Sequence, residues 1–271
     1  MYKKTLDYQM VIKSEEHNIL IDDLDIDFDI RKTCRIEPDI AYINIWNLDE
    51  TIYNFLLQND SILNLIVKTK GGNDVSFFRG KIDSHTVLRD VPIGAKKTPD
   101  ICTSIKLLDS SEEYLNSYIN EDYRDSVSSV RIIFDCLEAM GLKLNSPDII
   151  FAQKMYSSYK AKGPAHVVLK DICEDLNLHL FIQNGVVRSA AGFDFGNLSA
   201  IKTFSRANAS SPMIQGQSKI SFYAEFCPDS RPSDIIRCSF DEVSGLYFIS
   251  DMKFVGNNYN RTCITKITIG I

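Results

Sequence analysis

Residues 25–56 read DIDFDIRKTCRIEPDIAYINIWNLDETIYNFL and are the most informative stretch of the chain. It opens with apolar and acidic residues in alternation. This pattern is typical of a strand with one buried face, because successive side chains of a strand point to opposite faces. The apolar set is Ile26, Phe28 and Ile30, and the acidic set is Asp25, Asp27 and Asp29. We expect a half-buried strand with its carboxylates in solvent.

The rest of the stretch joins a second strand, Ala41–Trp46, directly to a short helix. One face of the strand is aliphatic and the other is aromatic and amide: Ile43 and Ile45 against Tyr42, Asn44 and Trp46. Asn47 or Asp49 can cap the helix, which carries Ile52, Phe55 and Leu56 on one side. Because both faces of this strand carry side chains that can pack, we expect a sheet that packs on two sides. No catalytic group is recognisable in this stretch.

Length and charge exclude several classes of protein. A chain of 271 residues, 44% of them hydrophobic, can form two or three domains or one large one. The net charge of −6 argues against a nucleic-acid-binding surface as the main function. The sequence contains no run of about 18 apolar residues, so it predicts no membrane-spanning helix. Met1–Asp7 lacks the apolar segment of a signal peptide, so we expect synthesis and assembly in a cytoplasm.

The seven cysteines are scattered along the chain: Cys34, Cys102, Cys136, Cys173, Cys227, Cys238 and Cys263. They form no CxxC or CxxH pair, so their spacing does not predict a zinc site or a redox motif. Most of them lie in apolar segments. We expect reduced, buried thiols that act as small hydrophobic side chains.

The first 110 residues predict strands with one short helix. The six strand candidates are Tyr8–Ile12, Leu24–Ile30, Ala41–Trp46, Ile62–Lys70, Val75–Val87 and Ile101–Leu107. Gly71–Asp74 indicates a hairpin turn, and Arg89–Pro99 a long exposed loop of the kind that contacts a partner. This content favours a barrel or a sandwich.

The spacing of apolar residues changes in the middle of the chain from the period of a strand to that of a helix. Ser126–Gly141 predicts a helix with Ser126 as N-cap, Gly141 at its end, and an apolar stripe of Val130, Ile133, Phe134 and Leu137. Gly163–Asn177 predicts a second helix, with Pro164 in its first turn. Leu178–Ile182 and Val186–Arg188 then predict a hairpin through Asn184 and Gly185.

Strand patterns return at the C-terminal end. The four candidates are Ser218–Phe226, Asp234–Phe240, Gly245–Val255 and Thr262–Ile269. They build either a second β domain or strands that complete the first one.

Three patterns, taken in their order along the chain, resemble the bacteriophage tail hub proteins, a baseplate hub family with relatives in contractile secretion machines. The patterns are Ala41–Leu48 followed by Phe77–Ile82, then Gly163–Leu169 through to Asn184–Val186, and finally Ser211–Ile214, Phe226–Pro228, Gly245–Ile249 and Gly256–Asn257. The chain departs from the family in being short and in reading Lys253-Phe254 where many members have a histidine.

The resemblance implies a fold and a set of partners. The fold class is mainly β with an α+β insertion: two tube-like β-barrel domains flank a small mixed α/β region. The implied domains are an N-terminal barrel over residues 1–110, a mixed α/β domain over 111–200, and C-terminal barrel strands over 201–271. The implied protein is a structural hub of the virion tail. It forms a homotrimer that adapts a sixfold tail tube protein to a threefold spike or tip protein, contacts the tape measure protein, and lets DNA pass through an acidic lumen that repels it.

Sequence patterns that would indicate an enzyme or metal site are few and weak. The histidines are His17, His85, His166 and His179, and none has a second histidine at metal-ligand spacing. Asp83 and His85 share a strand face, but no G-x-S-x-G nucleophile motif occurs. The acidic run from Glu15 to Asp29 could hold calcium, although the alternation of its aspartates from Asp23 on with apolar residues favours a solvated strand face. We therefore expect no catalytic, cofactor-binding or metal residues and no cofactor. The alternative is a carbohydrate- or peptide-binding module or a lytic enzyme of the same particle.

Overall fold

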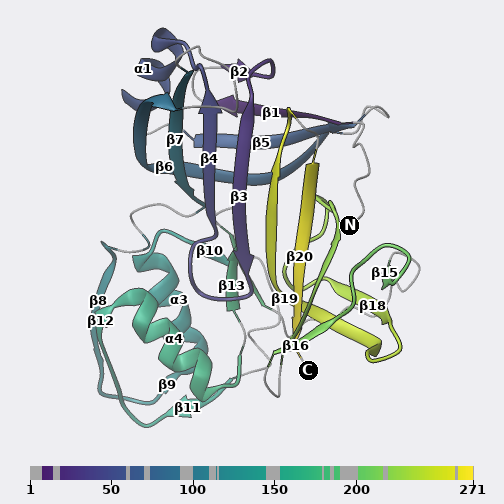
Figure 1. The fold of residues 1–271 in the computed structure, drawn as a ribbon. Coiled ribbons are helices and arrows are strands. Elements are labelled where there is room, and N and C mark those ends of the chain that lie inside the picture. Colours follow the sequence, from purple (N-terminus) through teal and green to yellow (C-terminus); the bar gives the residue numbers. More distant parts are fainter. Residues whose placement is uncertain are drawn as a thin grey trace. The chain divides into compact units, whose positions relative to one another are not determined.

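The computed structural model describes residues 8–14, 19–58, 62–69, 74–91, 100–109, 114, 116–144, 153–178, 180–183, 186–189, 201–215, 219–259 and 262–270. The chain divides into two compact units (Figure 1). Unit 1 comprises Met1–Lys32, Asp39–Asp109 and Ser199–Ile271, and unit 2 comprises Thr33–Pro38 and Ser110–Leu198. Both ends of the sequence thus belong to the same unit.

The N-terminal part of unit 1 is built of antiparallel strands and one helix. Its elements are β1 (Tyr8–Ser14), β2 (Leu20–Ile21), β3 (Ile26–Thr33), β4 (Ile40–Trp46), α1 (Glu50–Gln58), β5 (Ile62–Thr69), β6 (Asp74–Val91) and β7 (Asp100–Leu108). All six strands predicted here are confirmed. The predicted turn Gly71–Asp74 and the predicted loop Arg89–Pro99 fall mostly outside the described residues, but Arg89–Val91 belongs to β6 and not to a loop.

The alternating residues of β3 have the buried and the exposed face that the sequence predicts. Ile26 and Ile30 are fully buried and Phe28 is nearly so, while the aspartates between them are half-exposed. Asp49 caps α1, because its carboxylate accepts a hydrogen bond of 2.8 Å from the Thr51 N–H. That bond lowers the pKa of Asp49.

The C-terminal part of unit 1 consists of strands. They are β15 (Lys202–Ser205), β16 (Met213–Gln215), β17 (Lys219–Glu225), β18 (Ile235–Ser239), β19 (Ser244–Asn257) and β20 (Thr262–Gly270). The four strands predicted from the sequence are among them. The long strand β19 pairs with β18 through its first half and with β20 through its second half, with a bulge between Ile249 and Asp251.

The two parts form one continuous sheet because β19 pairs with β3 (Figure 1). The main path of the sheet is β16-β17-β20-β19-β3-β4-β7-β6-β5-β1-β2. Its two ends are not hydrogen-bonded to each other, so the described residues contain no closed barrel. The prediction of a mainly β chain is confirmed, whereas the prediction of two separate barrels is not, since the β3–β19 pairing merges both sets of strands.

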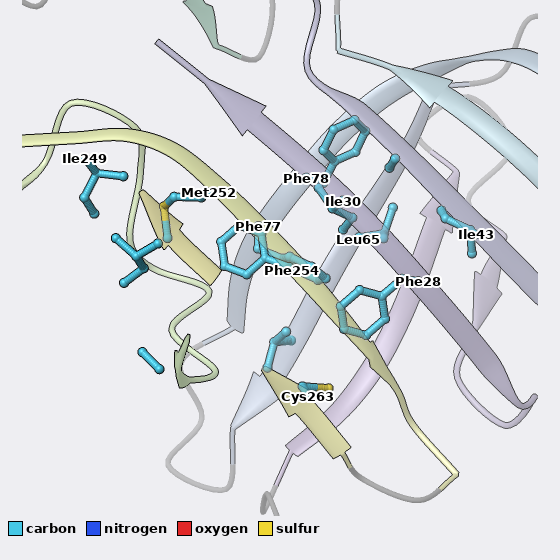
Figure 2. Close-up of a cluster of buried hydrophobic side chains, with 14 of the residues drawn as sticks. Phe28, Ile30, Ile43, Leu65, Phe77, Phe78, Ile249, Met252, Phe254 and Cys263 are labelled. Atoms are coloured by element: carbon cyan, nitrogen blue, oxygen red, sulfur yellow. The ribbon is translucent and has the colours of Figure 1, made fainter. Parts of the chain in front are cut away.

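Asn258 and a cluster of four phenylalanine rings hold the two parts together. Asn258 accepts a hydrogen bond from the Ile26 N–H (2.7 Å) and donates one to the Leu24 carbonyl (2.6 Å). The rings of the cluster are Phe28, Phe77, Phe226 and Phe254, with centroids 5.6–6.1 Å apart in the five contacting pairs. Figure 2 shows Phe28, Phe77 and Phe254 in this core, beside aliphatic side chains from both parts.

Unit 2 holds two 11-residue helices, α3 (Ser129–Ala139) and α4 (Ala165–Asp175). Its short strands are β8 (Tyr118–Tyr123), β9 (Val127–Ser128), β10 (Lys143–Leu144), β11 (Met155–Tyr156), β12 (Tyr159–Pro164), β13 (Leu180–Gln183) and β14 (Val186–Ser189). Both helices and the β13–β14 hairpin confirm the predictions, although the Asn184-Gly185 turn lies outside the described residues.

The two helices have the same spacing of buried positions, 36 residues apart in the sequence. Five positions are buried in each helix: Ser129, Ile132, Ile133, Cys136 and Leu137 match Ala165, Val168, Leu169, Ile172 and Cys173. Each helix ends in a left-handed residue, Gly141 at φ 64 and Asn177 at φ 51, with equivalent backbone hydrogen bonds. The two helices thus share the spacing of their buried face and the way they end, although the strands before them differ in length and partner.

Two details of the first predicted helix are wrong. Its N-cap is Ser128, which accepts a hydrogen bond from the Arg131 N–H, and not Ser126. Phe134, predicted to lie in the apolar stripe, is 47% exposed, while Ile132 and Cys136 are fully buried. The buried face is rotated because it follows the packing of α3 against α4, which helical spacing alone does not specify.

Candidate functional site

The described histidines do not form a catalytic pair. His85 is exposed on β6 and meets the Tyr53 ring edge-on at 5.8 Å. Asp83, predicted to share its face, forms an ion pair with Lys106 at 2.8 Å. His166 lies on α4 against the Tyr114 ring at 5.3 Å. The other two histidines lie outside the described residues.

The acidic strand β3 is a solvated face, as the alternation predicts. Asp27 accepts a hydrogen bond of 3.1 Å from the Trp46 indole N–H, and Asp29 forms an ion pair of 2.7 Å with Lys253. Within the described ranges, no group of three or more His, Cys, Asp or Glu side chains is arranged to hold a metal ion. These aspartates therefore organise the surface of the sheet.

None of the seven cysteines, all of which lie in described parts of the chain, forms a disulfide, and five of them are buried. Burial raises the pKa of Cys136 and of Cys173 to about 12 and that of Cys238 to about 11. Because the thiolate is the reactive form, these thiols are inert near neutral pH. The prediction of reduced cysteines that pack as small hydrophobic side chains is confirmed for these three.

A serine and a lysine lie in contact at the C-terminal strands, and no sequence pattern predicts this contact. The Lys202 ammonium donates to the Ser230 hydroxyl at 2.7 Å and to the Asp229 carboxylate at 2.5 Å. A serine nucleophile needs a neutral base and access to substrate. Here the lysine is paired with a carboxylate and Ser230 is 1% exposed. The contact is structural.

A buried charge cluster is the most unusual polar feature of unit 1. Lys32 is 4% exposed, Asp39 2% and Asp109 7%. Burial lowers the pKa of Lys32, against the opposing fields of Asp39 and Asp109, and Arg231 and Asp234 also act on it. Charged residues are rarely buried unless they compensate one another. This cluster is called the Lys32 cluster below.

Solvent-facing side chains form a polar row across six neighbouring strands. The row consists of Lys106 on β7, Tyr42 on β4, Asp29 on β3, Lys253 on β19, Lys266 on β20 and Tyr223 on β17. The Lys266 ammonium lies 6.0 Å from the centre of the Tyr223 ring. The face thus carries both signs of charge and exposed aromatic rings.

Apolar side chains are exposed at the two end strands of the sheet. At one end, Ile214 on β16 is 65% exposed although its cross-strand partner Ile220 is buried. At the other end, Leu20 on β2 is 47% exposed. End strands present unpaired backbone groups, and exposed apolar residues there are typical of strands that add to another chain.

Comparison with solved structures identifies the fold. A tail protein from Neisseria meningitidis MC58 superposes with a TM-score of 0.68 at 10% identity, over 97% of this chain and 96% of that one. The tail protein of prophage MuSo2 from Shewanella oneidensis gives 0.65 at 10% identity, over 96% and 97%. The chain has a phage tail protein fold.

A secretion-system protein shares this tail-protein fold. It is an Escherichia coli component of the type VI secretion system, described as structurally similar to the T4 bacteriophage tail proteins gp27 and gp5. The TM-score is 0.63 at 10% identity, over 95% of this chain and 76% of that one. The resemblance to tail hub proteins is confirmed for the fold.

Comparisons based on sequence find no relative of this chain. No family model matches the chain, and no curated protein matches it. A fold can persist at 10% identity, since cores tolerate extensive substitution when volume and patterning are preserved. In the parts of the chain that the structure describes, none of the helices has the length and hydropathy that crossing a membrane requires.

Proposed function

We propose that this protein is a structural, non-enzymatic hub of a phage tail or baseplate. The observation that carries the proposal is the match of at least 95% of the chain to the folds of two tail proteins and a type VI secretion component. The inert thiols and the buried, ion-paired contact between Ser230 and Lys202 support a role without catalysis.

The proposed assembly is a homotrimeric ring that adapts a sixfold tail tube to a threefold spike or tip and lets DNA pass. Its partners are the tube protein, the spike or tip protein and the tape measure protein. The protein belongs to the virion tail and is assembled in the host cytoplasm. The N-terminal strands within 1–110 and the C-terminal strands within 201–271 each act as a tube-like barrel module, with 111–200 as the mixed domain between them.

The end strands of the sheet offer a way to close such a ring. If β16 of one copy adds antiparallel to β2 of the next, Met213 lies opposite Leu20 and Ile214 opposite Ile19. Ile214 shares a face with buried Ile220, and Ile19 packs against the core, so apolar residues meet on that face. A contact between different surfaces of identical chains generates a closed ring when the rotation permits. The polar row then faces either the lumen or the outside.

The test is the mass of the full chain in solution, by sedimentation velocity over a range of concentrations. A trimer has three times the chain mass of 30.7 kDa. Ile214→Lys should shift the population toward monomer, whereas Leu246→Lys, at an exposed position on β19, should leave it unchanged. A wild-type chain that stays monomeric at every concentration would count against the hub. A trimer that persists in Ile214→Lys would refute only the edge contact.

A further inference from the structure

The chain crosses between the two units four times. At three of these crossings the flanking residue of unit 1 belongs to the Lys32 cluster. The crossings follow Lys32, Pro38, Asp109 and Leu198. The unit 1 residues next to the first three are Lys32, Asp39 and Asp109, which are all buried. The short segment Thr33–Pro38, which belongs to unit 2, is called the excursion below. The cluster contains the two unit 1 residues that flank the excursion, and also Asp109, after which the chain enters the rest of unit 2.

Direct hydrogen bonds fasten two of these points to each other. The Asp39 N–H donates to the Asp109 carboxylate at 3.0 Å, and the Asp109 N–H donates to the Asp39 carbonyl at 3.1 Å. The carboxylate that holds the Asp39 backbone is thus itself part of the cluster. A change in its electrostatic balance acts directly on the backbone at a crossing.

Lys32 provides the compensating charge and links this point to the C-terminal strands. Its ammonium lies 5.9 Å from the centre of the Phe254 ring on β19. Besides Asp39 and Asp109, the charged groups that act on it are Arg231 and Asp234, which precede β18. A cation among three carboxylates is the group whose loss leaves the most uncompensated buried charge.

The tip of the excursion is held within unit 2. Ile36 packs against the hydrophobic core of that unit, and the Tyr114 hydroxyl donates a hydrogen bond to the Ile36 carbonyl. Tyr114 is 1% exposed. A six-residue segment is therefore fixed at its base by a charge cluster and at its tip by a buried tyrosine.

We propose that the Lys32 cluster is a clamp, a conformational device that fixes three of the four chain crossings so that they open and close together. In the closed state the ammonium compensates the carboxylates and the reciprocal hydrogen bonds of Asp39 and Asp109 are formed. In the open state these bonds break and the base of the excursion exchanges with solvent, while the strands farther along the sheet stay folded.

The test is native-state hydrogen exchange of the full chain, read at the Asp39 and Asp109 amides. Lys32→Met should raise the exchange rates of both amides by tenfold or more, and by the same factor, if one opening exposes both. Lys253→Met is the matched control, since it removes a lysine whose pair with Asp29 is nearly half-exposed. Equal exchange of Asp39 and Asp109 in Lys32→Met and in Lys253→Met would overturn the clamp.

The wild-type chain supplies a second test that depends on no variant. If the clamp opens as one unit, the Asp39 and Asp109 amides must show the same dependence of exchange on urea, and they must exchange faster than the Leu63 amide. Different urea dependences for the two amides, or exchange only on global unfolding, would also overturn the proposal. This result remains decisive if Lys32→Met does not fold.

Discussion

Replacing Phe77 by alanine should destabilise unit 1 more than almost any other single change. Phe77 is 1% exposed and contacts three other rings of its cluster: Phe28 at 5.7 Å, Phe226 at 5.6 Å and Phe254 at 6.1 Å. Phe→Ala in a core costs about 3–5 kcal/mol. Edge-to-face ring pairs add roughly 0.5–1.5 kcal/mol each beyond the area that they bury. We expect a loss at the upper end, about 5 kcal/mol.

The assay is urea unfolding followed by the fluorescence of Trp46, the single tryptophan, which lies on β4 in the same unit. Phe77→Leu should lose only about 2 kcal/mol, because it keeps most of the buried area and gives up the ring contacts. Phe55→Ala is the matched control, since this phenylalanine on α1 is 50% exposed and should change stability by about 0.5 kcal/mol or less.

The decisive comparison is the order of the three variants. A loss below about 1.5 kcal/mol for Phe77→Ala, or equal losses for Phe77→Ala and Phe55→Ala, would refute the shared core. A double-mutant cycle between Phe77 and Phe254 extends the test, because these rings come from opposite ends of the sequence. It should return a coupling of about 0.5–1.5 kcal/mol, and additivity would contradict the contact.

Three further predictions concern single contacts. Asn258→Ala should lower the free energy of unfolding by about 1–3 kcal/mol, because two hydrogen bonds between the end of β19 and the start of β3 are lost. The control Asn120→Ala, at an exposed strand position, should be neutral. Equal urea midpoints for the two variants would contradict the prediction. Gly80→Ala should lower the melting temperature markedly, since a Cβ there would lie 2.6 Å from the Leu108 carbonyl oxygen, and an unchanged melting temperature would mean that β6 and β7 are not so close. Stability should fall as pH rises from about 9 toward 12, because the folded pKa of Cys136 and Cys173 is about 12 against an ordinary value of 9.0, so the unfolded chain loses these protons first. The double variant Cys136→Ala/Cys173→Ala should flatten that slope in thermal melts at a series of pH values, and a slope as steep as in the wild type would assign it to other groups.

Much of the fold could be predicted from local patterns. The strand at Ile26–Ile30, the helix cap at Asp49 and the helix stops at Gly141 and Asn177 are all fixed by residues close together in sequence. Side-chain alternation and capping depend on backbone geometry over a few residues, so they can be read without knowledge of the partner strand. The absence of a recognisable catalytic motif was visible at the same level.

The candidate site was less accessible to sequence reasoning. The Lys32 cluster draws on residues between positions 32 and 234, and each of them looks like an ordinary surface charge in its own segment. The contact of Lys202 with Ser230 is hidden for the same reason. Burial of a charge depends on what packs above it, and that packing comes from distant strands.

Local sequence patterns were enough to predict the long strands of unit 1, the two 11-residue helices of unit 2, and buried cysteines that pack as small hydrophobic residues. They did not predict β8 and β12 of unit 2. That the N-terminal and C-terminal strands share one sheet is visible only in the folded chain, in the pairing of β3 with β19 and in the ring cluster around Phe77. The physical reason is that periodicity specifies a face and not its partner. The choice of partner is made when a chain of more than 200 intervening residues closes and the two apolar faces exclude water together.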